Sequence, residues 1–163
     1  ILDEGHTSVD AFKGSWAGAM GQSQFMPISF LNYAVDYDGD GRKDIWQTEA
    51  DVFASIANYL SSEGWDNNGT WGRQVSVTQP IEEFGLSKSL YRPLADWQQA
   101  GVRRFDGSDL PNVDIQASLI MPDGSEGRVY LVYNNFHTLM KWNRSSYFGV
   151  SVGYLSERIK RGY

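Results

Sequence analysis

The spacing of apolar residues predicts two helices between residues 27 and 64. Pro27 suits the first turn of a helix, and the apolar side of that helix would consist of Ile28, Phe30, Leu31 and Ala34. A second helix is predicted by residues that recur at helical spacing, namely Val52, Phe53, Ile56, Ala57 and Leu60. Thr48 and Asp51 have the spacing of a capping box at its start, and Gly64 is a suitable stop. Residues 1–64 are therefore expected to be helical.

The pattern changes at the turn cluster of residues 66–69. Residues 73–78 alternate between polar and apolar, as in a strand, and residues 115–121 and 128–134 flank a hairpin signal at Pro122–Gly127. A short helix is predicted over 94–100, ended by Gly101. A last helix is predicted over 145–161, with one apolar face formed by Phe148, Val152, Leu155 and Ile159. The predicted fold class is α+β.

Charge is concentrated in the first third of the chain. The net charge is −6, and residues 1–51 hold nine acids and three bases, whereas residues 52–163 hold eleven of each. Five aspartates lie within residues 36–51, which indicates a cation site. Because the chain has no basic stripe, nucleic acid is not expected as a partner. Cysteine is absent, which excludes disulfides and thiolate chemistry. No apolar run has the length of a membrane span, so membrane attachment is expected only through a segment before Ile1.

Residues 36–44 fit the first nine positions of an EF-hand loop. Asp36, Asp38 and Asp40 occupy positions 1, 3 and 5, Gly41 provides the sharp turn at position 6, and the backbone carbonyl of Arg42 would add an oxygen. Such hard oxygen ligands favour a structural Ca²⁺ over Zn²⁺ or Mg²⁺.

Position 12 of this loop departs from the usual pattern. Gln47 stands where a bidentate Glu is expected, and Gln offers one neutral oxygen. Asp51, four residues later, is the proposed substitute. The alternative is an acidic, solvated turn without an ion, in which the clustered carboxylates would raise one another's pKa values.

Several segments together resemble the lytic murein transglycosylases of the membrane-bound B type. They are GSWAGAMGQSQFMP at 14–27, the aspartate loop with Asp44-Ile45-Trp46, SIANYL at 55–60, Gly64-Trp65, Asn135-Phe136 and WNRS at 142–145. The resemblance covers nearly the whole chain. It implies a lysozyme-like helical core with an EF-hand-like calcium loop over 1–65, a small β-rich region over 66–141, and a C-terminal helix returning to the core over 142–163.

The resemblance also implies roles for individual residues. Ser15, Gln24, Met26 and Tyr59 match positions that line the family's catalytic cleft, and Asp36, Asp38, Asp40, Arg42 and Asp51 match its calcium ligands. Trp142 and Phe148 stand where relatives usually carry Tyr, so each keeps an aromatic ring but lacks the phenol hydroxyl.

The family's reaction is non-hydrolytic cleavage of the β-1,4 bond between N-acetylmuramic acid and N-acetylglucosamine, which leaves a 1,6-anhydromuramoyl end. One Glu protonates the glycosidic oxygen and then takes the proton of the muramoyl O6 hydroxyl, which attacks C1. In the family that Glu lies upstream of the segment rich in Gly and small residues, 14–26 here, which we call the glycine-rich segment. We therefore expect the Glu outside this chain. The glutamates within the chain are weaker candidates: Glu4, Glu49, Glu63, Glu82, Glu83, Glu126 and Glu157. His6 and His137 have no partner in register and are expected to be structural or exposed.

These residues are compatible with three functions. The first is the C-terminal portion of a peptidoglycan lytic transglycosylase of the periplasm or envelope of a Gram-negative bacterium, active when the upstream Glu is present. The second is a non-catalytic, calcium-stabilised module that binds peptidoglycan glycan strands. The third, a calcium sensor, is weak because sensor loops usually come in pairs. A lysozyme-like core without its first helices would expose apolar surface, so a partner could be the chain's own N-terminal fragment.

Overall fold

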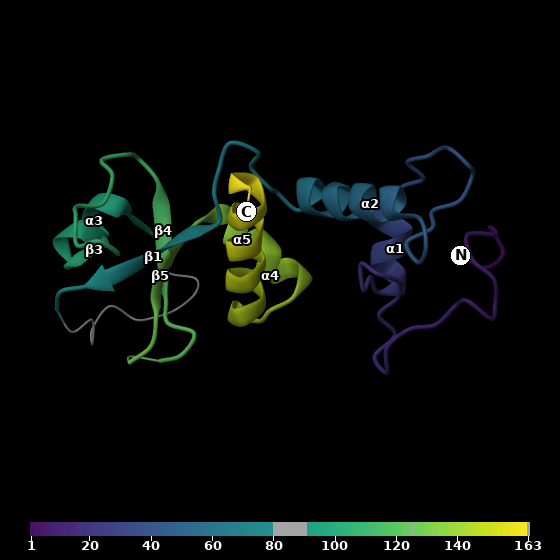
Figure 1. The fold of residues 1–163 in the computed structure, drawn as a ribbon, viewed down its shortest axis with the longest axis horizontal. Helices are drawn as coiled ribbons and strands as arrows, with labels where there is room; N and C mark the ends of the chain where they lie inside the picture. The colour runs from purple at the N-terminus through teal and green to yellow at the C-terminus, as the bar shows by residue number, and fades with distance from the viewer. Residues whose placement is uncertain (80–90, 125, 163) are drawn as a thin grey trace. The chain divides into compact units, whose positions relative to one another are not determined.

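A computed structural model describes residues 1–79, 91–124 and 126–162. The chain divides into two compact units, Ile1–Glu63 and Gly64–Tyr163, called unit 1 and unit 2 (Figure 1). Helices and strands are both present, which confirms the α+β class. Within the described part of the chain, every helix is too short or too polar to cross a membrane. The three-segment division of the chain stays a prediction.

Unit 1 contains two helices, α1 (Pro27–Tyr33) and α2 (Glu49–Ser62). Both lie where the apolar spacing predicts them, but residues 1–26 form turns and isolated bridges, so the helical prediction for that segment is wrong. Met20 pairs with Gly14 on one side and with Phe25 on the other. The glycines and small residues of this segment favour turns over helix, and the bridges hold it in a compact fold.

The helix α1 buries less of its apolar side than the pattern predicts. Phe30 and Ala34 are buried, whereas Ile28 and Leu31 are 63% and 53% exposed. In α2 the buried positions are Asp51, Val52, Ser55 and Tyr59, and Phe53 is exposed. The two helices pack on each other, and Ile28, Leu31 and Phe53 stay at the surface of unit 1.

The capping box predicted at the start of α2 is wrong. Thr48 is the N-cap residue, but its side chain makes no capping hydrogen bond. The Asp51 carboxylate accepts backbone N–H groups from the preceding loop instead. The spacing of Thr48 and Asp51 therefore locates the helix start correctly and assigns the wrong partners to Asp51.

Unit 2 contains a five-stranded antiparallel sheet in the order β2-β4-β5-β1-β3. The strands are β1 (Gly72–Val77), β2 (Arg92–Pro93), β3 (Val102–Arg104), β4 (Gln116–Ile120) and β5 (Val129–Val132), and the helices are α3 (Leu94–Gln99), α4 (Asn134–Trp142) and α5 (Ser146–Arg161). The predicted hairpin is confirmed as the antiparallel pair β4–β5, in which Leu119 lies opposite Leu131. The sequence pattern missed β2, β3 and α4.

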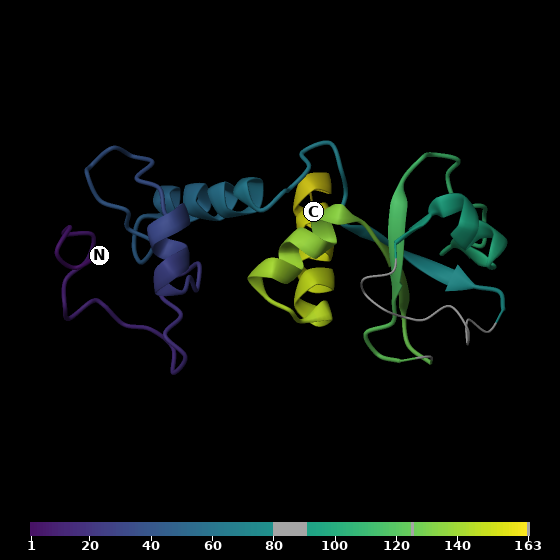
Figure 2. The same cartoon turned by 180° about the vertical axis from the view of Figure 1, so that it is seen from behind.

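Each face of this sheet carries its own core. On one face Val75, Ala117, Leu119 and Leu131 pack with Leu94, Trp97 and Val102. On the other face Ile120, Tyr130 and Val132 pack with Trp71 and Phe136, joined by Met140 and Val150. Figures 1 and 2 show α3 on one side of the sheet and the α4–α5 pair on the other.

The helix α5 packs through glycine, and the face predicted for it is wrong. Leu155 and Ile159 are 54% and 63% exposed, whereas Gly149 and Gly153 are buried. A Cβ on Gly149 would lie 2.6 Å from Cε2 of Phe136, and one on Gly153 would overlap the Trp71 ring. The helix approaches these two rings closely because the glycines carry no side chain.

We predict that Gly149→Ala destabilises unit 2, although alanine is normally the better helix former. The added methyl group must displace the Phe136 ring, and overpacking of this kind costs about 1–3 kcal/mol. Thermal or urea denaturation would measure the loss. Ser151→Ala, at an exposed position of the same helix, is the control and should leave the stability unchanged. Equal stability of the two variants would contradict the packing described here.

Candidate functional site: an acidic loop fastened to a glycine-rich segment

Three aspartates of unit 1 converge on one point. Carboxylate oxygens of Asp36, Asp38 and Asp51 lie within 4.8 Å of one another. The loop turns sharply at Gly39 and Gly41, whose φ angles are +77° and +88°, a region that L-amino acids with side chains rarely adopt. Asp51, the predicted substitute for position 12, thus lies close to Asp36 and Asp38, the first and third positions of the loop.

Asp51 is the buried member of this group, with 1% of its surface exposed. Its Oδ1 accepts the backbone N–H of Tyr37 at 2.8 Å, and its Oδ2 accepts that of Asp44 at 2.8 Å. It also lies in the first turn of α2, where the helix dipole favours a negative charge. One carboxylate therefore joins both arms of the loop to the start of α2.

The other predicted ligands are placed less directly. Oδ1 of Asp40 accepts the Arg42 backbone N–H at 2.8 Å, and Asp40 lies outside the group of three. Oδ1 of Asp44 accepts the backbone N–H groups of Trp46 and Gln47, each at 2.9 Å. The ligand roles of Asp40 and Arg42 stay predictions. Three carboxylates within reach of one point fit a hard cation such as Ca²⁺.

The residues that follow the acidic loop (36–44) are hydrogen-bonded to the glycine-rich segment. The Gln22 backbone N–H donates to the Ile45 carbonyl at 2.9 Å, and Gln22 Nε2 donates to the Trp46 carbonyl at 3.0 Å. A Cβ on Gly21 would lie only 2.5 Å from the Ile45 carbonyl oxygen, so this contact requires glycine. His6 is structural, as predicted, because its Nδ1 accepts the Lys43 backbone N–H at 3.1 Å.

Three of the predicted substrate contacts lie on the glycine-rich segment and are exposed. Ser15 Oγ accepts the backbone N–H groups of Ala17 and Ala19 at 3.3 and 3.2 Å, which closes a tight turn. Met26 approaches that turn, since a Cβ on Gly18 would lie 3.9 Å from its Cε. Among the described residues, Gln24 alone has a positive φ without being glycine, at 54°. Such strained backbone is concentrated at functional sites.

The fourth predicted contact, Tyr59, lies on α2 and is 8% exposed. Its ring packs against Phe25 with the ring centroids 5.9 Å apart, and meets Tyr33 edge-on at 4.8 Å. Phe25 stands between Gln24 and Met26 in the chain, so the structure brings Tyr59 to the segment that carries them. Burial raises the pKa of the Tyr59 hydroxyl, with a further contribution from the Glu63 charge, so the hydroxyl stays protonated near neutral pH.

The last two predicted contacts belong to unit 2. Trp142 ends α4, and Phe148 lies in the first turn of α5. The short connection 143–145 joins them, and both side chains are half-buried.

The glutamates named as weaker candidates have different surroundings. Glu63 is half-buried at the C-terminus of α2, and it accepts a hydrogen bond from the Tyr33 hydroxyl at 2.6 Å. Glu4, Glu49 and Glu126 are exposed, and Glu157 pairs with Arg73 and Arg161. Glu82 and Glu83 lie outside the described residues.

Comparison with known protein families matches residues 1–157 to the Transglycosylase SLT domain. The chain belongs to this family. It is 35% identical over 148 residues to the membrane-bound lytic murein transglycosylase B of Escherichia coli K12. The matched residues cover 90% of this chain and 39% of that protein. The family resemblance predicted from the sequence is confirmed.

Solved structures of SLT-family proteins have the same fold. SltB3 from Pseudomonas aeruginosa, in complex with NAG-anhNAM-pentapeptide, matches with a TM-score of 0.92 and 40% identity, covering 99% of this chain and 44% of that one. The Escherichia coli lytic transglycosylase Slt35, in complex with calcium, matches with a TM-score of 0.73 and 32% identity, covering 89% and 45%. The chain thus spans less than half the length of these relatives.

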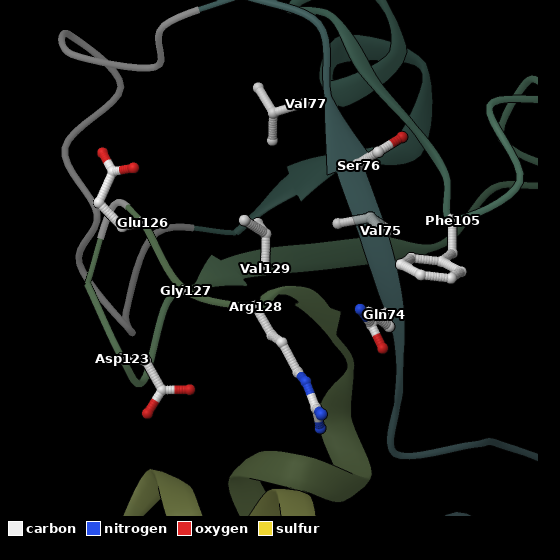
Figure 3. Close-up of a pocket in the computed structure, with 10 residues that line it drawn as sticks. All are labelled: Gln74, Val75, Ser76, Val77, Phe105, Asp123, Glu126, Gly127, Arg128 and Val129. Atoms are coloured by element: carbon white, nitrogen blue, oxygen red, sulfur yellow. The ribbon is translucent and has the colours of Figure 1, made fainter.

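Unit 2 of this SLT-family chain contains a groove that the sequence pattern does not predict. Its volume is about 480 Å³, and it lies where β1 continues past the first residue of β5. Figure 3 shows Asp123, Glu126 and Arg128 on the hairpin side and Phe105 on the other side of β1. The predicted contact and metal residues are not among its lining residues. Its exposed charges are of both signs, so the groove specifies no single ligand.

His137, predicted to be structural or exposed, is half-buried and packs at a tilt against Tyr91 with the ring centroids 4.8 Å apart. Its Nε2 is buried without a hydrogen-bond partner among the described residues, and burial lowers its pKa from the usual 6.5. The imidazole is therefore neutral in the folded protein near neutral pH.

We predict that His137 makes unit 2 less stable in acid. Its folded pKa lies below its unfolded pKa, so the unfolded chain binds the proton first. Stability is therefore complete above about pH 6.5 and falls as the pH drops from there toward the folded pKa. Urea denaturation of wild type and His137→Phe at pH 7.5 and 5.5 measures this difference. The variant should lose less stability between the two pH values, and equal losses would contradict the assignment.

Proposed function

We propose that this chain is the glycan-holding portion of a peptidoglycan lytic transglycosylase. The observation that carries the proposal is the connection of Gln24 and Tyr59, through Phe25, on a segment fastened at Gly21 and Gln22 to the acidic loop. An exposed Gln on strained backbone beside aromatic rings is suited to a sugar, because flat rings match the apolar face of a pyranose and the amide can accept hydrogen bonds at Oε1. Its Nε2 donates to the Gly21 carbonyl at 2.9 Å, which fixes the direction of the amide. Complexes of SltB3 with muropeptides support the substrate class.

The proposed contacts divide by chemistry. Ser15 and Gln24 would offer polar groups to the N-acetyl and hydroxyl groups of the glycan, and Met26 and Tyr59 would offer apolar surface. Trp142 and Phe148 of unit 2 would add aromatic platforms. The substrate is a glycan strand of alternating N-acetylglucosamine and N-acetylmuramic acid.

The proposed reaction is cleavage of the MurNAc–GlcNAc bond with formation of a 1,6-anhydromuramoyl end. One carboxylic acid protonates the leaving oxygen and then accepts the O6 proton as O6 attacks C1, so no water is consumed. We assign this acid to a segment that the 163 residues do not include. The family pattern of Glu, a small residue, any residue, an aromatic residue and Gly is absent from the sequence.

Other exposed apolar residues of unit 1, which include Ile28 and Leu31, would pack against the segment that supplies the acid. The proposed location is the periplasm or cell envelope of a Gram-negative bacterium, in keeping with the cell-wall activity named for the relatives.

The acidic loop is proposed to hold a structural Ca²⁺ through Asp36, Asp38, Asp40, Asp51 and the carbonyl of Arg42. The ion would offset the repulsion among these four carboxylates. The related structure of Slt35 in complex with calcium supports this choice of metal. Because Gln22 is bonded to the residues that follow the loop, the ion would brace the glycine-rich segment against α2.

We predict that Ca²⁺ raises the melting temperature of the chain, and that Asp51→Asn and Asp40→Ala abolish the rise. At a free Ca²⁺ concentration 100 times the dissociation constant, binding adds about 2.7 kcal/mol of stability. Differential scanning fluorimetry with EDTA and with Ca²⁺ measures the shift. Asp10→Asn, an exposed acid outside the loop, is the control and should keep the full rise. A wild-type response in Asp51→Asn would disprove the site.

We predict that the chain binds NAG-anhNAM-pentapeptide and that Gln24→Ala weakens binding about fivefold, the equivalent of one hydrogen bond of about 1 kcal/mol. Isothermal titration calorimetry measures the affinity, and Gln99→Ala, an exposed glutamine of α3, serves as the control.

Mass spectrometry of peptidoglycan incubated with the chain tests the second part of the proposal. We expect no 1,6-anhydromuropeptides from the 163 residues alone, and formation of these products once the upstream Glu is restored. Products from the chain alone would refute the assignment of the acid. Binding without products from the longer protein would favour a non-catalytic wall-binding module.

A further inference from the structure

Tyr33 and Glu63 form a hydrogen-bonded pair beside Tyr59. The Tyr33 hydroxyl donates to Oε1 of Glu63 at 2.6 Å, a length typical of charge-assisted O–H···O⁻ bonds, which are about twice as strong as neutral ones. The bond to the Glu63 carboxylate raises the pKa of the Tyr33 hydroxyl. The hydroxyl is therefore a permanent donor near neutral pH, and the pair joins the last residue of α1 to the C-cap of α2.

The position of Glu63 is electrostatically unfavourable without such a donor. A carboxylate at the C-terminus of a helix meets the negative end of the helix dipole and the unpaired carbonyls of the last turn. Glu63 is also half-buried. The Tyr33 hydroxyl offsets part of this cost and fixes the direction of the Tyr33 side chain at the same time.

The Tyr33 ring bears directly on Tyr59. The two rings meet edge-to-face with their centroids 4.8 Å apart, and Phe25 packs against Tyr59 at 5.9 Å. Asn58 Nδ2 also donates to the Tyr33 carbonyl at 2.9 Å, which ties the Tyr33 backbone to the residue before Tyr59. Phe25 brings a ring from the glycine-rich segment to Tyr59, and Tyr33 brings one from α1. The Tyr33 ring is held in addition by a charged hydrogen bond.

We propose that Tyr33 and Glu63 are positioning residues, which hold Tyr59 in the one orientation that contacts the glycan. The inference rests on the proposed function, because it assumes that Tyr59 and its neighbour Gln24 meet the sugar. Tyr33 acts through its ring, and Glu63 acts through the Tyr33 hydroxyl. Without the bond, Tyr59 samples further orientations, and the bound orientation must be selected from them at a cost in affinity.

The test compares four variants of the whole chain by calorimetry with NAG-anhNAM-pentapeptide, at a temperature where each is folded. Tyr33→Phe and Glu63→Ala should each bind more weakly by up to about fivefold, because reorienting Tyr59 can cost no more than the lost hydrogen bond contributes to holding it. The double variant should bind no more weakly than the weaker single variant, because both changes remove the same bond. Glu63→Gln should stay within about twofold of wild type, since the Gln carbonyl oxygen can still accept from the Tyr33 hydroxyl.

The chain offers a matched control for the loss of a tyrosine hydroxyl. In unit 2 the Tyr147 hydroxyl donates to Oδ1 of Asp123 at 2.7 Å, so Tyr147→Phe removes a bond of the same kind without touching the Tyr33–Glu63 pair. That variant should bind the muropeptide as wild type does. Aromatic NMR reports the orientation of the Tyr59 ring independently of the stability of the fold. The Tyr59 ring signals should broaden or average in Tyr33→Phe and stay unchanged in Tyr147→Phe.

The outcomes separate the inference from the proposed function. If Gln24→Ala weakens binding while Tyr33→Phe and Glu63→Ala bind as wild type, the positioning role is wrong and the glycan contact stands. If Gln24→Ala also binds as wild type, the proposed contact itself is wrong. Should Glu63→Ala fail to fold, Tyr33→Phe decides, because phenylalanine keeps the ring against Tyr59. Lower melting temperatures with unchanged affinity would show a purely structural pair and overturn the inference.

Discussion

Unit 1 depends on the two hydrogen bonds that the buried Asp51 carboxylate accepts. Its oxygens hold the backbone N–H groups of Tyr37 and Asp44, one on each arm of the acidic loop, while its Cα belongs to the first turn of α2. A buried carboxylate is costly unless both oxygens are satisfied, and here the backbone and the helix dipole satisfy them together. The start of α2 and the shape of the loop are therefore set by the same side chain.

This constraint extends from the loop to the proposed glycan contacts. Ile45 follows Asp44, and its carbonyl receives the Gln22 N–H at a point where Gly21 permits close backbone approach. Gln24 and Phe25 follow at once, and Phe25 meets Tyr59 two turns along α2. A closed path thus runs from the carboxylate cluster through both segments and back to the same helix. A cation bound by Asp36, Asp38 and Asp51 would tighten this path at the point where like charges strain it most.

Local chemistry made much of this arrangement predictable from the sequence. The aspartate spacing with Gly41 predicted the convergence of Asp36 and Asp38, and the missing Glu at position 12 drew attention to Asp51. Three features depended on tertiary contacts that no local pattern reports. Asp51 is bonded to the backbone N–H groups of Tyr37 and Asp44 rather than to that of Thr48, because the folded loop brings those two donors onto the buried carboxylate. The helix α5 packs through Gly149 and Gly153 because Phe136 and Trp71 fill the space that a side chain would need. The helix α4 begins with two asparagines, which are poor helix formers, and Asn135 stabilises it by bonding to the backbone of Asp66.

Two carboxylates at opposite ends of α2, Asp51 in its first turn and Glu63 at its C-cap, show why position matters more than residue type. Asp51 stands at the positive end of the helix dipole, where a negative charge is favoured, and it organises a loop. Glu63 stands at the negative end, where the same charge is disfavoured, and the Tyr33 hydroxyl that reaches it from α1 offsets part of that cost. The apolar period predicted the helix itself and placed Tyr59 within it, but it could not show that Glu63 is half-buried, because that depends on where α1 ends. Tyr59 lies on α2 between Asp51 and Glu63. The acidic loop fixes one end of this helix, and the hydrogen bond from Tyr33 fixes the other.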